Sequence, residues 1–437
     1  MANEIFERNM VKETVASLNI ANLSSASIGE VLSVAMSLEA KTGIPFIRMD
    51  QGVPGLPAGQ IGIEAEKAAL DRGVGNMYPP MMGIPELKNA ASRFMKAFLN
   101  IDIAPKSCIP ATGSASVSFV SFAATTQRIA GKNKVLFIDP GFSVQKAQLN
   151  ILGIPSESFD VYAYRGQALE AKLRSYLDKG DIAALLYSNP NNPAWISLNE
   201  EELQIIGRLA TEYDVVVLED LAYFCMDNRQ DFSKPNVAPY PPTVARYTDN
   251  YIIMASASKM FSYAGQRLGL ACISDSLFNR KYPALAERYH DSGIFGLTFA
   301  TSILYTLSAG CTMSTQYGVA AMLNAAADGE YDFVHDVSIY ARRAERMKKM
   351  LSENGFHIVY DKDCDRTIGD GFFFTVGYKN MTCSELMEEL LYYGISSISL
   401  STTGSGQEGI RACTSKLTDD MFPLFEDRLK RFAMDHR

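Results

Sequence analysis

The chain has 437 residues, of which 47% are hydrophobic and 21% charged, and its net charge is −8 at pH 7. This length favours two domains, and the negative charge gives no electrostatic reason to bind nucleic acid or an anionic membrane. The seven cysteines occur singly and the four histidines lie far apart, so we expect neither a disulfide scaffold nor a metal site.

The N-terminal residues lack a basic region followed by an apolar core, so we expect no signal peptide and predict a cytoplasmic protein. Residues 25–41 contain a capping-box pattern, Ser27-Ile28-Gly29-Glu30, followed by apolar residues at helical spacing. This pattern predicts an amphipathic helix. The Gly- and Pro-rich residues 50–57 are predicted to form a loop.

Between residues 108 and 275, short apolar runs alternate with helical patterns. The runs cover residues 135–138, 183–187, 215–218, 251–254 and 268–273. Strands that are apolar on both faces are typical of a mainly parallel sheet that is covered by helices on both sides. We therefore predict an α/β domain.

Several of these runs are followed by polar or aromatic residues, and open α/β sheets bind polar ligands beyond the carboxyl ends of their strands. Residues 112–116 enter a helix and expose backbone N–H groups to an anion, although such a turn often only caps its helix. Phe142 stands where a ring could stack on a planar ligand, or where it could simply pack in the core. Residues 188–193 form a stiff loop in which two prolines bracket asparagines.

Two ionisable residues carry the strongest chemical signal. Asp220 follows the run at 215–218, and a buried aspartate is costly unless a cation such as a protonated pyridinium faces it. The alternative is an aspartate that caps a turn. Lys259 follows the run at 251–254, with Ser256 and Ser258 before it and Arg267 after it. A lysine that forms a Schiff base, beside hydroxyls and an arginine that hold a phosphate, predicts pyridoxal 5′-phosphate as cofactor. The alternative is a surface lysine on a serine-rich loop.

The last third of the chain has a different pattern. The uncharged residues 293–313 are long enough to resemble a membrane span, but their hydroxyl groups and glycines favour a buried helix and loop. A charged helix is predicted over residues 332–354, strands over 372–376, 395–400 and 409–413, and a helix at the C-terminus. These elements predict a second, α+β domain that packs tightly on the first.

Taken in order, these segments resemble a fold-type I pyridoxal-phosphate enzyme of the class I/II aminotransferase family, the aspartate aminotransferase superfamily. The similarity runs from about Ile47 to Arg411, and its most specific motifs are Asn189-Pro190-Asn191-Asn192-Pro193 and the Lys259 segment with Gly265-x-Arg267. The resemblance implies an α/β fold with a large, mainly parallel domain and a smaller α+β domain. It divides the chain into an N-terminal arm and helix of the small domain (1–55), a large cofactor-binding domain (56–310) and a small C-terminal domain (311–437).

The same resemblance implies the roles of individual residues. Lys259 and Asp220 would be the catalytic residues, as the Schiff-base lysine and the partner of the pyridinium nitrogen. Tyr78 would reach the phosphate of a neighbouring subunit. The cofactor-binding residues would be Tyr78, Gly113, Ser114, Ala115, Phe142, Asn192, Asp220, Tyr223, Ser256, Ser258, Lys259 and Arg267, and the substrate-binding residues Gly52, Asn192 and Arg411.

The activity that the resemblance implies is transfer of an amino group from an L-amino acid to a 2-oxo acid, by a ping-pong mechanism in a homodimer with shared active sites. A lyase or synthase of the same fold, of the cysteine-sulfur β-lyase or aminocyclopropane-carboxylate synthase type, is the alternative. A pyridoxal-phosphate-sensing transcription factor is disfavoured, because only about 45 residues without a basic cluster precede the similarity.

Two departures from the family pattern concern the substrate. Ala194-Trp195 stands where Thr-Gly usually follows the asparagine loop, and Trp195 either packs the loop, which we favour, or walls the substrate pocket. Residues 296–300 offer no arginine for a distal carboxylate, and we cannot place Arg288 from the sequence. This puts aspartate or glutamate specificity in doubt and favours a neutral or aromatic substrate.

Overall fold

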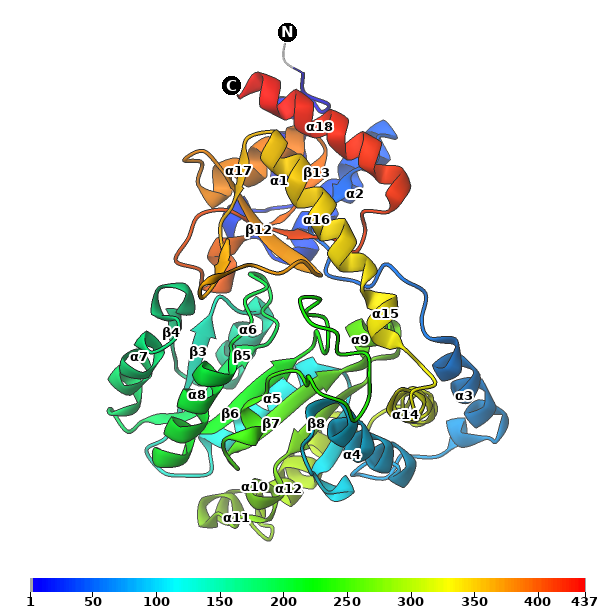
Figure 1. Cartoon of the computed structure of the whole chain (residues 1–437), viewed down its shortest axis with the longest axis vertical. Coiled ribbons are helices and arrows are strands. Elements are labelled where there is room, and N and C mark those ends of the chain that lie inside the picture. The colour runs from blue at the N-terminus through cyan, green and yellow to red at the C-terminus, as the bar shows by residue number, and fades with distance from the viewer. Residues whose placement is uncertain (1–2, 437) are drawn as a thin grey trace.

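A computed structural model describes residues 3–436, which form two packed parts, one above the other in Figure 1. The larger part is built on a seven-stranded sheet. Its strands, in spatial order, are β2 (Cys108–Ala111), β8 (Gly269–Ile273), β7 (Tyr251–Ser256), β6 (Val216–Leu221), β5 (Ile182–Ser188), β3 (Lys134–Asp139) and β4 (Ser156–Asp160). All neighbouring pairs are parallel except those that β8 makes with β2 and β7. The predicted α/β fold with a mainly parallel sheet is confirmed.

The sheet is apolar on both faces because successive side chains of a strand point to opposite sides. Leu185 and Val217 belong to one buried cluster with α4 (Pro85–Leu99), α7 (Ala168–Leu177), α8 (Glu200–Glu212) and α14 (Met313–Ala327). Leu186 and Leu218 belong to a second cluster with α5 (Ser114–Thr126) and the segment around Phe299. The uniformly apolar runs in the sequence therefore reflect helices on both sides of the sheet.

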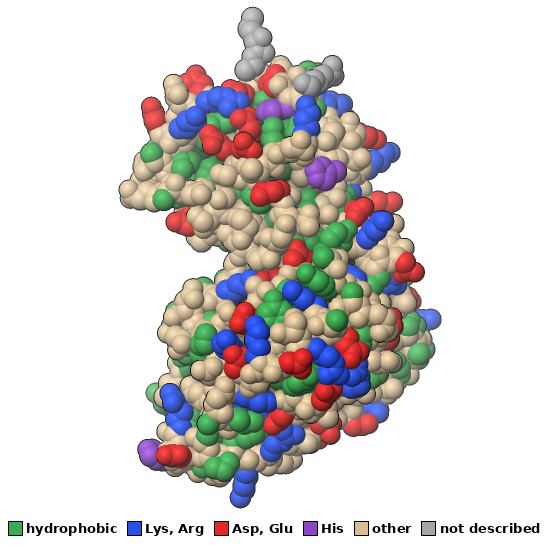
Figure 2. All heavy atoms as spheres, turned by 90° about the vertical axis from the view of Figure 1, so that its left-hand side faces the viewer, with side chains coloured by type: hydrophobic (Ala, Val, Ile, Leu, Met, Phe, Trp, Pro, Cys, Tyr) green, Lys and Arg blue, Asp and Glu red, His purple; other side chains and the backbone are tan. Residues whose placement is uncertain are grey.

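The smaller part holds a four-stranded antiparallel sheet in the order β14 (Ile398–Ser399), β15 (Ile410–Cys413), β12 (Phe373–Tyr378) and β9 (Phe356–Ile358). Near it, β1 (Ile47–Arg48) pairs in parallel with β13 (Ile395–Ser396), so the N-terminal segment packs with the C-terminal one. The helices here are α1 (Arg8–Ser17), α2 (Ile28–Thr42), α16 (Ile339–Glu353), α17 (Cys383–Tyr392) and α18 (Phe422–Asp435). The first and last helices, α1 and α18, both lie in this part, and the outline narrows between the two parts in Figure 2.

Further helices and two short strands complete the fold. They are α3 (Gln60–Asp71), α6 (Ser143–Leu152), α9 (Ala257–Met260), α10 (Asp275–Asn279), α11 (Pro283–Tyr289), α12 (Phe295–Leu297), α13 (Tyr305–Ser308), α15 (Phe333–Val337), β10 (Lys362–Asp363) and β11 (Arg366–Thr367). A π-helical segment, Thr298–Leu304, joins α12 to α13, where the sequence predicted a helix and a loop. Within residues 3–436, no helix combines the length and apolar character that a membrane crossing requires.

Several local predictions can be compared with the elements. The capping box at Ser27 and Glu30 is formed at the start of α2. The helix predicted over 332–354 is two helices, α15 and α16, that meet at Ser338, and the strand predicted over 395–400 is split into β13 and β14. Strand β4 was missed because it is a polar edge strand.

The division into domains stays a prediction. Helix α14, which the predicted boundary at residue 310 assigns to the small domain, packs against α3 and α4 of the larger part. These contacts favour a boundary after α14.

Candidate active site

The predicted site residues converge at one edge of the seven-stranded sheet. Strands β5, β6 and β7 are parallel, so Ser188, Asp220 and Ser256 near their carboxyl ends lie at the same edge. Strand β8 runs in the opposite direction, so its start, just after Arg267, lies at this edge as well. The alternation of strand and helix thus brings together residues that are far apart in the sequence.

Asp220 is a buried carboxylate that is held by neutral donors. The side chain of Gln145 donates a hydrogen bond of 2.8 Å to its Oδ2, and the backbone N–H of Ala222 donates one of 3.1 Å to its Oδ1. Among the described residues, no cation forms an ion pair with Asp220, and burial raises the pKa of this carboxyl to about 6. A buried carboxylate in such a place favours a cationic ligand.

Lys259 lies in the short helix α9, directly after β7. Its ammonium group donates a hydrogen bond to the backbone carbonyl of Gly52 and lies 5.4 Å from the ring centroid of Phe372. Burial lowers the pKa of Lys259 to about 8, and within residues 3–436 the amine has no carboxylate partner. A fraction of the lysine is therefore neutral near pH 7, as a nucleophile requires.

Arg411 comes from β15 of the small sheet and completes the site from the other side. Its guanidinium donates to the carbonyl of Asp50 over 2.6 Å and to Oδ1 of Asn192 over 3.4 Å, and lies 4.6 Å from the ring centroid of Phe373. Its Nε is buried and has no hydrogen-bond partner among the described residues. The carboxylate of Asp50 pairs with Arg48, and within residues 3–436 Arg411 forms no ion pair of its own. A carboxylate ligand would supply the negative charge and the hydrogen-bond acceptors that Arg411 lacks.

The loop after β5 fixes the backbone of Asn192. The hydroxyl oxygen of Ser188 accepts a hydrogen bond of 3.2 Å from the backbone N–H of Asn192. The neighbouring Asn191 has a structural role, because its side chain donates to the carbonyl of Pro140 over 2.6 Å and accepts from the backbone of Ala194 over 2.9 Å. The side-chain N–H2 of Asn192 makes no hydrogen bond within the described part of the chain, so it is free to donate to a ligand.

A second group of predicted residues surrounds the start of α5. Gly113 has φ 75°, and a Cβ there would lie 2.6 Å from Nη2 of Arg267, so the guanidinium passes directly over this glycine. Ser114 and Ala115 form the first turn of α5, where backbone N–H groups favour an anion. Across from it, Ser256 and Ser258 begin α9. The donors gathered here suit a phosphate.

Aromatic side chains surround the space between these groups. Phe142 precedes α6 and is half-buried, while Tyr223 is buried with its ring centroid 5.4 Å from that of Phe372 and 5.3 Å from that of Phe373. Trp195 is fully buried and lies edge-on to Tyr223, with 5.5 Å between the ring centroids. Its burial agrees with the interpretation that Trp195 packs the loop.

Two other residues are also placed by the structure. Tyr78 is 85% exposed, so it does not reach the site of its own chain. Arg288 lines a separate surface cleft together with Gln127 and Gly131.

The site contains residues that sequence reasoning missed. Gln145, Phe372 and Phe373 contact the predicted groups directly, and Asp50 fixes Arg411 through its backbone. The phenylalanines were noticed only as a strand pattern. Gln145 lies three residues after Phe142, which is the one signal that could have drawn attention to it.

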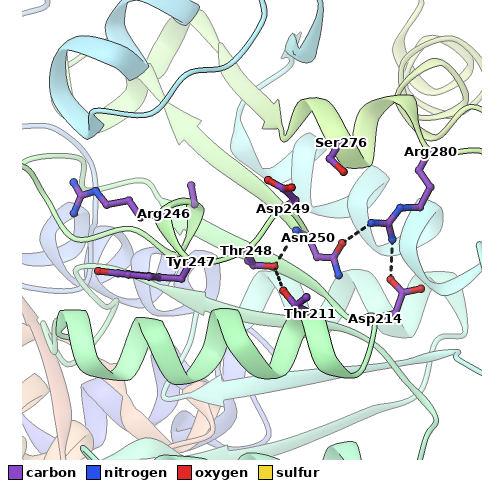
Figure 3. A pocket seen from close by; sticks show the side chains of 10 residues that line it. Thr211, Asp214, Arg246, Tyr247, Thr248, Asp249, Asn250, Ser276 and Arg280 are labelled. Atoms are coloured by element: carbon purple, nitrogen blue, oxygen red, sulfur yellow. Dashed lines mark hydrogen bonds and ion pairs between the residues drawn. The ribbon is translucent and has the colours of Figure 1, made fainter.

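A cleft of about 530 Å³ lies elsewhere on the larger part (Figure 3). It is lined by Asp214 and Asn250, which precede β6 and β7, so it lies at the opposite edge of the sheet. Several of its polar side chains are paired with one another: Arg280 donates to Asp214 and to Asn250 over 3.0 Å each. Residues 3–436 also contain no group of three acidic, histidine or cysteine side chains placed to hold a metal ion.

The fold and the meeting of a buried lysine, aspartate and arginine define a fold-type I enzyme. Residues 46–428 match the family described as aminotransferase class I and II, and the chain belongs to this family. Members of the family use pyridoxal 5′-phosphate.

Relatives of known name are distant. A probable aspartate aminotransferase of Methanocaldococcus jannaschii is 24% identical over 59% of this chain and 62% of its own. The aromatic-amino-acid aminotransferase 2 of Thermococcus litoralis is 30% identical over 47% of this chain and 51% of its own. The chain thus spans only about half to three fifths of the length of these relatives.

Solved structures share the fold over nearly the whole chain. An alanine aminotransferase from Pyrococcus furiosus superimposes with a TM-score of 0.75, at 19% identity, over 96% of this chain and 99% of its own. A double mutant of aspartate aminotransferase from Thermus thermophilus gives a TM-score of 0.73, at 18% identity, over 94% of this chain and 96% of its own.

The residues present fit the family's cofactor. A cationic ring nitrogen suits the unpaired Asp220, an aldehyde suits the amine of Lys259, and a phosphate suits the donors beside Gly113 and Arg267. A side chain at position 113 would fill the space that Arg267 occupies, so the glycine is part of this fit.

Proposed function

We propose that this protein is a pyridoxal-phosphate-dependent aminotransferase that moves the amino group of an L-amino acid to a 2-oxo acid by a ping-pong mechanism. One observation carries the proposal: Lys259, Asp220 and Arg411 meet in one site, and none of them forms an ion pair within residues 3–436. Leaving three ionisable groups unpaired in a protein interior is costly, and such groups cluster at functional sites.

Each of the three groups has a distinct task. When bound, the cofactor supplies an aldehyde that accepts the amino group and a cationic ring that withdraws electrons. Asp220 would hold the ring nitrogen in its protonated form through its carboxylate. Arg411 orients the substrate by binding its α-carboxylate with two N–H groups, and Asn192 holds Arg411 in place. Lys259 would hold the cofactor through its aldehyde, and once the amino group of the substrate has replaced it there, the amine of Lys259 would move the α-proton of the substrate.

The protein environment favours these tasks. The pKa of Lys259, lowered to about 8 by burial, puts the amine near the pH at which a general base is most efficient. The rings of Phe372, Phe373 and Tyr223 exclude water from the space around Lys259 and Arg411. This exclusion strengthens the electrostatic interactions of both groups.

The test is an absorbance titration of the purified protein. A visible band that bleaches with an amino acid and returns with a 2-oxo acid establishes transamination, and parallel double-reciprocal lines establish the ping-pong order. Release of pyruvate and ammonia without an oxo-acid acceptor establishes a lyase instead. Absence of a band after addition of pyridoxal 5′-phosphate refutes the cofactor assignment.

We also propose a homodimer with shared active sites that works in the cytoplasm. Support for the dimer comes from Tyr78, whose side chain is 85% exposed beside Met77 and Met81, which are each 51% exposed. The cysteines are free, which suits a reducing compartment. If Tyr78 serves the neighbouring site, mixing impaired Tyr78→Ala and Lys259→Ala proteins should restore activity, because a hybrid dimer then has one complete site. No recovery on mixing would contradict shared sites.

A further inference from the structure

Helix α6 carries two buried glutamines, Gln145 and Gln148, that no motif predicted. They are three residues apart, so they lie on the same face of the helix. Their side chains are 4% and 9% exposed. A buried amide is costly unless its donors and acceptors are used, so the partners of these two residues reveal what they do.

Gln145 contacts the ring-nitrogen end of the proposed cofactor site. Its Nε2 donates to Oδ2 of Asp220 over 2.8 Å, and the backbone N–H of Ala222 holds the other carboxylate oxygen. Both donors are neutral, so they fix the orientation of the carboxylate without cancelling its charge. A cation at position 145 would pair with Asp220 and compete with a cationic ring nitrogen.

Gln148 contacts the phosphate end of the same site. Its Nε2 donates to the backbone carbonyl of Ala115 over 2.7 Å, and its Oε1 accepts from the hydroxyl of Ser118 over 2.7 Å. Ala115 belongs to the first turn of α5, next to Ser114. Because Ser118 lies on α5 as well, Gln148 connects α6 to the start of α5 at two points.

We propose that Gln145 and Gln148 are positioning residues that set the distance between Asp220 and the first turn of α5. The two anchors come from different elements, β6 and α5, and α6 contacts both of them through one rigid turn. A ligand that carries a cationic ring at one end and a phosphate at the other must meet both anchors at once. The inference rests on the proposed cofactor and adds the residues that keep Asp220 and the first turn of α5 at a fixed distance from each other.

The test uses two probes that each occupy one end of the site. Pyridoxal, which lacks the phosphate, requires the Asp220 end, and inorganic phosphate requires the α5 end. Gln145→Met and Gln148→Met keep the side-chain volume and remove the hydrogen bonds. Asn150→Ala, at an exposed position of the same helix, is the matched control. Binding is measured on the cofactor-free protein, by absorbance for pyridoxal and by calorimetry for phosphate.

The expected result is crosswise. Gln145→Met weakens pyridoxal about tenfold and leaves phosphate unchanged, whereas Gln148→Met weakens phosphate about tenfold and leaves pyridoxal unchanged, in keeping with the loss of one hydrogen bond to a buried group. Both variants weaken pyridoxal 5′-phosphate, and Asn150→Ala weakens nothing. If a methionine variant does not fold, Gln145→Asn and Gln148→Asn replace it, because asparagine stays polar but is too short to reach the partner.

Two outcomes overturn the inference. In the first, each variant binds both probes as tightly as wild type does. In the second, each folded variant loses the same amount of affinity for pyridoxal as for phosphate. Failure of the proposed cofactor has a different signature, because wild-type protein would then bind neither pyridoxal nor pyridoxal 5′-phosphate.

Discussion

Replacing Asp220 by asparagine removes one buried ionisable group while keeping the shape of the side chain. In the cofactor-free protein, burial raises the pKa of this carboxyl from 3.8 to about 6. The folded protein therefore binds the proton more tightly than the unfolded chain, so the contribution of Asp220 to stability is present at low pH and is lost as the pH rises through 6. Asparagine does not titrate and has no such loss.

The size of the effect follows from the two pKa values. The raised pKa corresponds to a total change of about 3 kcal/mol in the free energy of unfolding, of which about 1.4 kcal/mol falls between pH 5 and pH 8. The free energy of unfolding of Asp220→Asn, relative to wild type, should therefore rise by about 1.4 kcal/mol over this interval. Other titrating groups, Glu219 among them, are present in both proteins and cancel in the difference.

Urea denaturation of the cofactor-free proteins at several pH values measures this difference. The control is Asp102→Asn, because the side chain of Asp102 is 87% exposed and its replacement should show no comparable rise with pH. A difference between Asp220→Asn and wild type that is constant from pH 5 to pH 8 would refute the reasoning. Addition of pyridoxal 5′-phosphate at pH 8 should stabilise wild type more than Asp220→Asn, because only the carboxylate pairs with a cationic ring.

Three further predictions concern the other anchors of the site. Lys259→Met should be more stable than wild type at pH 7 without cofactor. Because the pKa of Lys259 is lowered, wild type gains stability as the pH rises. Urea denaturation should therefore show the difference in the free energy of unfolding shrinking by about 2.5 kcal/mol between pH 7 and pH 10. Arg411→Lys should bind amino acids at least tenfold more weakly in absorbance titrations, because an ammonium cannot make a bidentate pair, while amines without a carboxylate should bind both proteins equally. Gly113→Ala should weaken pyridoxal 5′-phosphate, because its Cβ displaces Arg267. The control Gly131→Ala has a similar positive φ but open space around it, so it should lose about 1 kcal/mol of stability and no cofactor affinity.

The sequence allowed good prediction of those parts of the site that depend on local patterns. Apolar runs that end in polar residues predicted the strand ends at Asp220 and Lys259, and the capping box predicted the start of α2. The meeting of these residues followed from a general property of parallel sheets. Their individual roles came from the family resemblance and stay predictions.

The remaining features depend on contacts between distant segments. The bond between Gln145 and Asp220 joins α6 to β6 across 75 positions of sequence, and no local pattern encodes it. Strand β4 has a polar pattern because it lies at the edge of the sheet, where one side has no neighbouring strand. The break at Ser338 separates two helices whose apolar spacing alone would continue. In each case contacts between distant segments, and not the local sequence, determine the observed structure.

Two adjacent carboxylates on β6 differ in how far their hydrogen-bonding capacity is met by the protein. Glu219 and Asp220 are both buried, and they point to opposite faces because they are neighbours on a strand. Glu219 accepts hydrogen bonds from Tyr187, from Thr243 and from the backbone of Val244, so its polar capacity is met within the chain. Among the described residues, Asp220 accepts two hydrogen bonds, from Gln145 and from a backbone N–H, and it lies near the strand end where Lys259 and Arg411 converge. Burial raises both pKa values, to about 7 and about 6, so titration alone does not distinguish them. The hydrogen-bond positions left open around Asp220 distinguish it from Glu219, because a carboxylate that binds a ligand must keep room for a donor from outside the chain.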